Sequence, residues 1–194
     1  MNPKVAVIIP AYNPSDKLVS LVCELKNLFS PLVIVVDDGN SVEMNEIWDE
    51  LIIKNCIVLH HRENKGKGVA IKTAISYLLS ENIDIIGYVT ADSDYQHRPN
   101  DICRVAKALQ DNPDKLILGV RNFSKECVPF RSKIGNMLAS KLFHLETGIG
   151  LTDTQTGLRG VPMKYAEFSA NISVEMKYQT QTPCGKFGLL VQNL

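Results

Sequence analysis

Two carboxylates, an amide and an imidazole follow one another closely in this sequence, as Asp92, Asp94, Gln96 and His97. Two carboxylates one residue apart on an extended segment point to the same side and repel unless a positive charge lies between them. Mg²⁺ and Mn²⁺ suit such a pair, because they bind through one or two carboxylates and complete their shell with water and phosphate oxygens. Gln96 would add a neutral oxygen, and His97 would flank the site. The alternative is a solvated turn, in which aspartate is common.

The acidic segment follows residues 83–90, an apolar run typical of a buried parallel strand. Similar apolar runs predict further strands, and amphipathic segments between them predict helices. The predicted strands are 5–9, 32–36, 57–59, 83–90 and 115–120, and the predicted helices are 15–29 (capped by Ser15 or Asp16), 41–54, 68–80 and 99–110. This alternation predicts an α/β fold, with a mostly parallel sheet covered by helices on both faces. Polar clusters follow each strand, so we expect them along one rim of the sheet, where ligands bind.

Composition excludes several classes of protein. The 194 residues carry equal numbers of acidic and basic side chains, so a nucleic acid is not the expected partner. The five cysteines form no Cys-x-x-Cys pair, and their odd number fits a reducing cytoplasm better than a disulfide framework or a zinc site. No apolar run approaches the ~20 residues of a membrane span, and the start of the sequence does not resemble a signal peptide.

Two other features are weaker signals. Gly66-Lys67-Gly68 has neither the spacing of a P-loop nor that of a dinucleotide fingerprint. A lysine at a helix start suits an anion, and a simple loop-to-helix turn is the alternative. The histidines have no metal-ligand spacing, and we expect His60 and His61 in a loop.

Taken together, the motifs resemble those of family 2 glycosyltransferases of the GT-A fold, over residues 5–162. The motifs are Val7-Ile8-Ile9-Pro10-Ala11-Tyr12-Asn13, Val35-Val36-Asp37-Asp38-Gly39, Asn64-Lys65-Gly66-Lys67-Gly68, Asp92-Ser93-Asp94-Tyr95-Gln96-His97, Gly119-Val120-Arg121, Arg131-Ser132-Lys133-Ile134-Gly135-Asn136 and Thr152-Asp153-Thr154-Gln155-Thr156-Gly157-Leu158-Arg159. The last two resemble the dolichol-phosphate mannosyltransferase branch, whose members load a sugar from GDP or UDP onto a polyprenyl phosphate.

The resemblance implies a role for each matching residue. Nucleotide binding is implied for Pro10, Tyr12, Asn13, Asp37, Asp38, Lys67 and Asp92, with Asp38 accepting hydrogen bonds from the base and Asp37 supporting it. Metal binding, by Mg²⁺ or Mn²⁺, is implied for Asp92, Asp94 and Gln96. Arg121 would face the diphosphate and Arg131 the acceptor phosphate, while Asp153 and Gln155 match a loop near the sugar and acceptor.

These residue types suit sugar transfer to a phosphate. A metal and an arginine can neutralise the charge that develops on a leaving nucleoside diphosphate. A phosphate monoester is already ionised near neutral pH, so no general base is required. For Arg121 and Arg131 the alternative is an ordinary surface charge. Residues 130–147 predict an amphipathic helix that packs on the core or, alternatively, lies on a lipid surface as a peripheral membrane contact.

The resemblance fades after Pro162. We therefore expect a catalytic domain over 1–162 and a shortened, divergent tail over 163–194 that is mobile and buries little. Two other functions compete with sugar transfer. A sugar nucleotidyltransferase would want a glycine-rich basic loop directly after the first strand, where this chain has Pro10-Ala11-Tyr12-Asn13. A nucleotide-binding protein without turnover is the second alternative.

Overall fold

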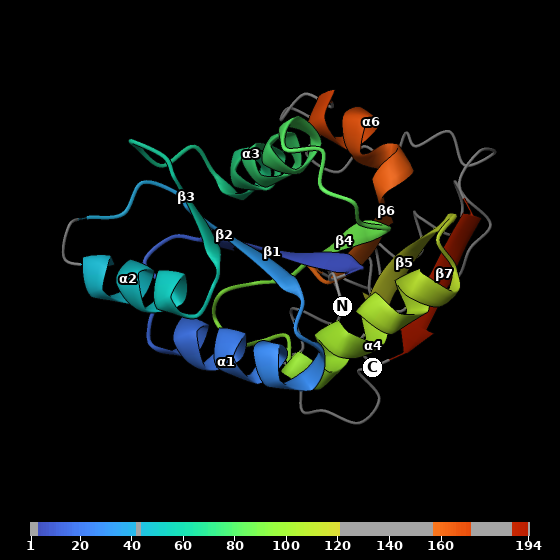
Figure 1. Cartoon of the computed structure of the whole chain (residues 1–194), viewed down its shortest axis with the longest axis horizontal. Helices are drawn as coiled ribbons and strands as arrows, with labels where there is room; N and C mark the ends of the chain where they lie inside the picture. Colours follow the sequence, from blue (N-terminus) through green and yellow to red (C-terminus); the bar gives the residue numbers. More distant parts are fainter. Residues whose placement is uncertain (1–3, 42–43, 121–156, 172–187, 194) are drawn as a thin grey trace, which may run out of the picture.

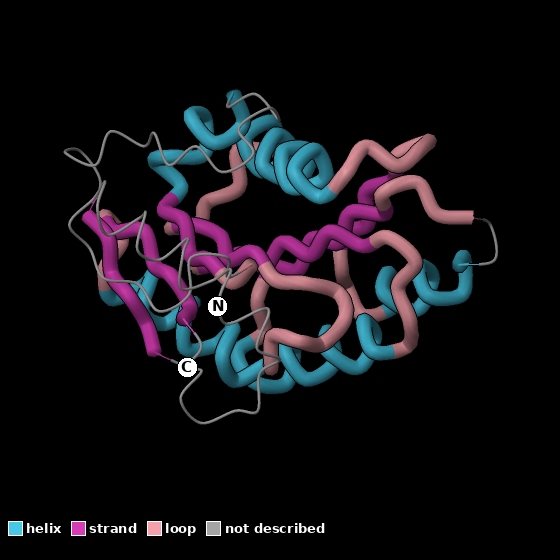
Figure 2. Tube along the Cα trace, turned by 180° about the vertical axis from the view of Figure 1, so that it is seen from behind, coloured by secondary structure: helices cyan, strands magenta, loops and turns pink. Residues whose placement is uncertain are grey.

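The computed structural model describes residues 4–41, 44–120, 157–171 and 188–193. They form one layer of β-sheet between two layers of helices (Figures 1 and 2). The strands are β1 (Val5–Ala11), β2 (Leu32–Asp37), β3 (Ile57–His60), β4 (Gly87–Thr90), β5 (Lys115–Val120), β6 (Arg159–Pro162) and β7 (Gly188–Asn193). The helices are α1 (Lys17–Phe29), α2 (Asn45–Ile53), α3 (Lys67–Ser80), α4 (Pro99–Asp111), η2 (Met163–Tyr165) and α6 (Ala166–Asn171).

The sheet has the strand order β3-β2-β1-β4-β6-β5-β7. β3, β2, β1 and β4 run parallel to one another, and β7 runs parallel to β5. β6 is antiparallel to both of its neighbours, β4 and β5. The expectation of a mostly parallel sheet with helices on both faces is therefore confirmed.

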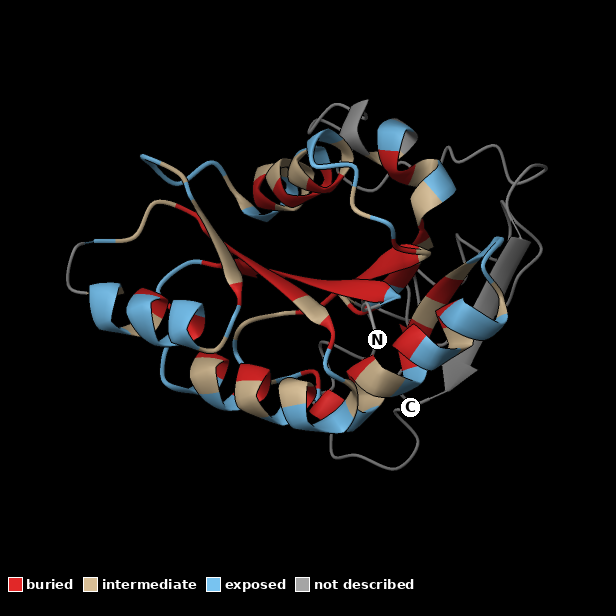
Figure 3. Ribbon diagram, viewed as in Figure 1, coloured by how far each residue is buried: buried red, intermediate tan, exposed pale blue. Residues whose placement is uncertain are grey.

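Side chains of the central strands alternate between two cores, as the period of an extended chain requires. Val7 and Ile9 of β1 pack under α1, α2 and α4, whereas Ile8 packs under α3 and α6. Figure 3 shows the central strands buried throughout and the helices buried only along their inner faces. Both faces of the sheet are thus covered, which leaves the ends of the strands as the place where a ligand can reach the polar groups.

Three local predictions are corrected. The strand predicted over 83–90 is only Gly87–Thr90, because Asn82 has a φ of 48° and the chain turns back on α3, where the Ile83 N–H donates to the Leu78 carbonyl. Neither Ser15 nor Asp16 caps α1 through its side chain; the Ser15 carbonyl accepts from the Leu18 N–H instead. The predicted helix over 41–54 begins only at Asn45.

The end of the chain also differs from expectation. After Pro162 the chain forms η2 and α6, and β7 then pairs with β5 from Lys115 opposite Gly188 to Val120 opposite Asn193. The expectation of a mobile tail therefore does not hold for residues 188–193, which form a strand of the sheet. The domain boundary at 162 stays a prediction. In the described part of the chain no helix combines the length and the apolar character that crossing a bilayer needs.

Candidate active site

Eight residues line a cleft of about 350 Å³ at the C-terminal ends of β1, β2 and β4. They are Pro10, Ala11, Tyr12, Asp38, Lys67, Asp92, Ser93 and Asp94. The loops after these parallel strands meet at one rim of the sheet, as the sequence predicted. The cleft therefore brings together the segments after β1, β2 and β4 with the first residue of α3.

Asp92 lines this cleft and contacts both the start of α3 and the end of its own loop. Its Oδ1 forms an ion pair with Nζ of Lys67, at the start of α3. Its backbone N–H donates a hydrogen bond to Nδ1 of His97 over 3.1 Å. The ring of His97 is buried, so this bond closes the loop between the two residues. Nδ1 must be unprotonated to accept it, which assigns the ring hydrogen of a neutral His97 to Nε2.

The second acid, Asp94, lies in a tight turn within that loop. Its Oδ1 accepts a hydrogen bond from the Gln96 N–H at 3.0 Å. Between them, Tyr95 has a φ of 68°, a left-handed conformation that costs a bulky residue energy. The Tyr95 hydroxyl donates to Oε1 of Glu24 on α1 over 2.5 Å, which stabilises the turn from outside. Whether the Gln96 amide reaches a metal stays a prediction.

Gly157 packs directly against the Asp92 carboxylate, although it lies far away in sequence. β6 pairs antiparallel to β4, and the Thr90 hydroxyl donates to the Gly157 carbonyl at 2.8 Å. A Cβ on Gly157 would lie 2.9 Å from Oδ2 of Asp92 and 3.1 Å from both Lys67 Nζ and His97 Cε1. A side chain here would therefore displace the ends of Asp92 and Lys67. The sequence placed Gly157 within a motif but gave it no role.

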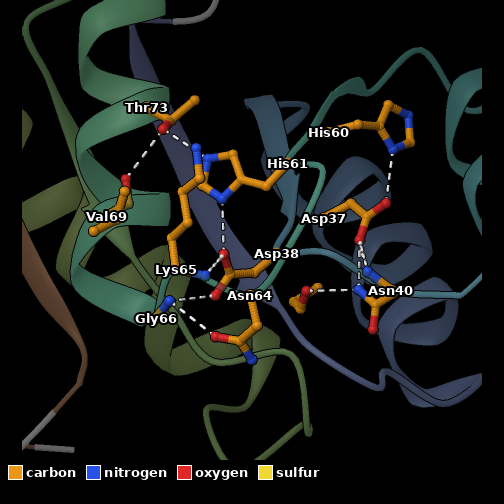
Figure 4. A network of polar contacts seen from close by, with 11 residues as sticks. Asp37, Asp38, Asn40, His60, His61, Asn64, Lys65, Gly66, Val69 and Thr73 are labelled. Atoms are coloured by element: carbon orange, nitrogen blue, oxygen red, sulfur yellow. Dashed lines mark hydrogen bonds and ion pairs between the residues drawn. The ribbon is translucent and has the colours of Figure 1, made fainter.

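Asp38 is buried and accepts three hydrogen bonds from His61 and the loop before α3 (Figure 4). Oδ1 accepts from the Lys65 N–H at 3.0 Å and contacts Nδ1 of His61 at 2.7 Å, and Oδ2 accepts from the Gly66 N–H at 2.8 Å. Burial raises the pKa of Asp38, but the hydrogen bonds from Lys65, His61 and Gly66 outweigh it and bring that pKa below its ordinary value. Asp38 is therefore an anion that fixes the start of α3.

His61 lies in a loop, as expected, but its side chain is not a free loop side chain. It follows β3 directly, its side chain is buried, and its Nε2 lies 2.8 Å from the Thr73 hydroxyl of α3 (Figure 4). The Thr73 hydroxyl can in turn donate to the Val69 carbonyl at 3.1 Å. His61 therefore links the Asp38 carboxylate to α3. The expectation that His60 lies in a loop is wrong, because it is the last residue of β3 and pairs with Asp37 of β2; its Nδ1 contacts Oδ2 of Asp37 at 2.7 Å.

Asp37 lies beneath the cleft rather than in its lining. Its Oδ1 accepts from both the backbone N–H and the side-chain amide of Asn40, at 2.9 and 2.5 Å. The same amide group donates to the Ala11 carbonyl, and Oδ1 of Asn40 accepts from the Asn13 N–H at 2.5 Å. Asn40, which the sequence did not single out, thus joins the loop after β2 to the loop after β1 (Figure 4).

The remaining predicted residues divide into two groups. Pro10 and Tyr12 line the cleft, and the Tyr12 side chain is exposed, whereas Asn13 does not belong to the lining. Asn13 has a left-handed backbone conformation, with a φ of 48°, and its backbone N–H donates to Asn40. The other group lies outside the described residues: Arg121, Arg131, Asp153, Gln155 and the helix predicted over 130–147.

The carboxylate oxygens of the cleft suit a cation that takes most of its coordinating atoms from water or a phosphate rather than from the protein. Among the described residues, no group of three or more histidine, cysteine or acidic side chains is placed to hold a metal. Asp92 and Asp94 offer two carboxylates, which is the usual protein contribution to Mg²⁺ or Mn²⁺ bound together with a phosphate. The arrangement therefore suits a metal–diphosphate complex better than a metal held by protein alone.

Comparison with known proteins identifies relatives that align with about four fifths of this chain. A UDP-N-acetylglucosamine–dolichyl-phosphate N-acetylglucosaminyltransferase of Methanococcus voltae is 32% identical over 170 residues, covering 79% of this chain and 67% of that protein. An undecaprenyl-phosphate 4-deoxy-4-formamido-L-arabinose transferase of Klebsiella pneumoniae is 24% identical over 164 residues, covering 80% of this chain and 48% of that protein. The chain thus spans only part of the length of these relatives.

Solved structures show the same fold. Glucosyl-3-phosphoglycerate synthase from Mycobacterium tuberculosis, in complex with Mn²⁺, UDP and phosphoglyceric acid, superposes with a TM-score of 0.61 at 18% identity. The match covers 84% of this chain and 56% of that one. The family model described as "Glycosyl transferase family 2" matches residues 6–171, which is most of the chain. This match, the fold and the acidic cleft at the end of β4 together show that the chain belongs to glycosyl transferase family 2.

Proposed function

We propose that this protein transfers a sugar from a nucleotide diphosphate sugar to a polyprenyl phosphate, with a divalent cation bound at Asp92 and Asp94. One observation carries the proposal: the cleft places these two acids beside Lys67 and Asp38. Lys67 and a cation on the two acids suit a diphosphate. Asp38, whose carboxylate accepts hydrogen bonds, suits an N–H group of the base. The two relatives, which are named as transferases acting on dolichyl and undecaprenyl phosphates, support the same acceptor class.

Uracil is the base that we propose for the donor nucleotide. A carboxylate has about four acceptor positions. Asp38 already uses three of them, for Lys65, His61 and Gly66. One position suits the single ring N–H of uracil, whereas guanine presents two neighbouring donors. The relative from Methanococcus voltae, whose name gives UDP-N-acetylglucosamine as its donor, supports the same choice.

The bound cation would supply electrostatic stabilisation of the leaving diphosphate. The chain's own groups have separate tasks. Asp92 and Asp94 would hold the cation, Lys67 would neutralise phosphate charge, and Pro10 and Tyr12 would form the wall of the nucleotide pocket. Arg121 would face the diphosphate, and Arg131 would bind the acceptor phosphate through the planar fork that phosphate oxygens fit. Asp153 and Gln155 would belong to a loop near the sugar and acceptor. The acceptor phosphate is already ionised, so no side chain need remove a proton.

A nucleotide panel tests the donor side. Thermal unfolding is measured with UDP, GDP, CDP and ADP, each with and without Mn²⁺. UDP with Mn²⁺ should stabilise most, because a ligand at ~100 times its Kd adds about 2.7 kcal/mol to the free energy of unfolding. Asp92→Asn and Asp94→Asn should lose the effect of Mn²⁺, while Asp84→Asn, an exposed acid before β4, should keep it. Stabilisation by UDP that does not depend on Mn²⁺ would contradict the metal assignment.

A product assay tests transfer. Incubation with UDP-linked sugars and dolichyl or undecaprenyl phosphate should yield a lipid-linked sugar. Arg131→Ala should lower kcat/KM for the lipid phosphate by the equivalent of about 1.5–3 kcal/mol, which is the value of one charge-assisted hydrogen bond. The affinity for UDP should not change. Nucleotide binding without any product from either lipid would favour a binding protein without turnover.

A further inference from the structure

The ammonium group of Lys67 stands where a cation on Asp92 would have to bind. Lys67 Nζ pairs with Oδ1 of Asp92, and the Gly157 backbone closes the far side, since a Cβ there would lie 2.9 Å from Oδ2. Two cations within a few ångströms of one carboxylate repel strongly in a cleft that partly excludes water. Lys67 and a divalent cation therefore compete for Asp92, and each weakens the binding of the other at this carboxylate.

The loop before α3 fixes the backbone position of Lys67 and so places its side chain within contact of Asp92. The two oxygens of Asp38 accept the Lys65 and Gly66 N–H groups, and Gly66 has a φ of 88°. α3 then begins at Lys67, so its side chain starts from an anchored position on the cleft lining. The side chain itself is half exposed, which leaves it room to swing while the backbone stays in place.

We propose that Lys67 is an exchangeable counter-ion: it neutralises Asp92 in the empty cleft and moves to the phosphate oxygens when a metal–nucleotide complex binds. The inference rests on the proposed function, because it needs a metal on Asp92 and a diphosphate beside it. Lys67 then opposes the binding of a metal alone but favours the binding of a metal with its nucleotide. Free metal is kept out of the site until the donor arrives.

This exchange predicts effects of opposite sign from one substitution. Lys67→Met keeps the length of the side chain and removes its charge. Mn²⁺ alone, measured by the loss of its free electron paramagnetic resonance signal, should bind about fivefold more tightly, because a partly exposed ion pair has been removed. UDP in saturating Mn²⁺, measured by calorimetry, should bind about 10- to 100-fold more weakly, because a charge-assisted contact is lost. Lys67→Arg, which keeps the charge, should leave the Mn²⁺ affinity unchanged.

Lys72→Met is the matched control, since Lys72 lies further along α3 and outside the cleft lining; neither affinity should change. If Lys67→Met weakens both ligands or leaves Mn²⁺ binding unchanged, while UDP–Mn²⁺ still binds the wild-type chain, the exchange is wrong and the proposed function stands. If Mn²⁺ does not bind the wild-type chain even with UDP, the proposed function itself fails, and the exchange with it.

Discussion

A Cβ placed on Gly157 would lie 2.9 Å from Oδ2 of Asp92, so the segment that leads into β6 packs closely against the acid that follows β4. The contact couples the acidic turn to a part of the chain beyond residue 156. The position of the carboxylate thus depends on the backbone of Gly157 as much as on the loop that carries Asp92.

Gly157→Ala should therefore weaken metal-dependent nucleotide binding. The added methyl group would press on Asp92, Lys67 and His97 at once, at 2.9–3.1 Å. The ends of the Asp92 and Lys67 side chains can shift to make room, so the cost should be near the low end for overpacking, about 1 kcal/mol, and the affinity for UDP with Mn²⁺ should fall by about fivefold. Calorimetric titration measures the affinity.

Gly68→Ala is the matched control, because a Cβ on Gly68 would meet nothing within 4 Å. Gly68 lies in the first turn of α3, where alanine is the better helix former, so the variant should be equally or more stable and bind UDP as before. If Gly157→Ala bound UDP and Mn²⁺ as the wild-type chain does, the close contact would have no part in holding Asp92.

Several strands and the position of the cleft could be predicted from local sequence alone. Apolar runs such as 5–9 and 32–36 located the strands, because a buried parallel strand is apolar on both faces. The polar residues after them located the rim, and Asp38, Lys67, Asp92 and Asp94 do line the cleft. The sequence did not predict β6 or β7, nor the insertion of β6 between β4 and β5, since these pairings depend on contacts distant in sequence.

The missed site residues have the same cause. His61 is a loop residue, and its local sequence does not indicate that its side chain contacts Asp38 and Thr73. Asn40 reads as one turn residue among several until its side chain is seen to contact Ala11 and Asn13, in the loop after another strand. Polar residues with roles in positioning carry no local signal, because their partners come from elsewhere in the chain.

Asn40→Asp should destabilise the protein. The substitution keeps an oxygen to accept from the Asn13 N–H but removes the amide that donates to Asp37 and the Ala11 carbonyl. It also places a second carboxylate against Asp37, and the unpaired, partly buried acceptors cost about 1–3 kcal/mol. Urea unfolding monitored by circular dichroism measures the loss in the free energy of unfolding.

Asn100→Asp serves as its control. This residue is exposed in the first turn of α4, where a negative charge favours the helix N-terminus, so stability should not fall. Equal stability of the Asn40→Asp and wild-type chains would mean that Asn40 does not hold the two loops together.

Deletion of residues 188–194 should also lower stability. β7 pairs with β5 along its whole length, so the deletion removes several hydrogen bonds, each worth a net ~0.5–1.5 kcal/mol, and exposes the edge of β5. UDP affinity of the folded protein should not change, because the cleft lies on the β1, β2 and β4 side of the sheet. Deletion of Leu194 alone, which follows β7, is the control. An unchanged urea midpoint after the longer deletion would mean that β7 adds nothing to stability.

Asp38 should make stability depend on pH in the acid range. Burial raises its pKa, but the hydrogen bonds from Lys65, His61 and Gly66 prevail and hold it below the ordinary value of 3.8. A carboxyl with a lowered pKa in the folded protein stabilises it fully above the unfolded value, and this contribution is lost as pH falls through the folded value. Asp38→Asn cannot titrate and lacks this contribution.

The unfolding free energies of the wild-type and Asp38→Asn chains are therefore compared between about pH 5 and pH 2.5. Near pH 5 the wild-type chain should be more stable by about 1–3 kcal/mol, because the substituted amide is uncharged and its NH2 group cannot accept the N–H of Lys65 or Gly66 on that side. Below about pH 4 this difference should shrink, since protonation of Asp38 removes the advantage of its charge. A difference that stays constant over the whole range would show that Asp38 gains nothing from the N–H groups of Lys65 and Gly66, and that the start of α3 is fixed by other contacts.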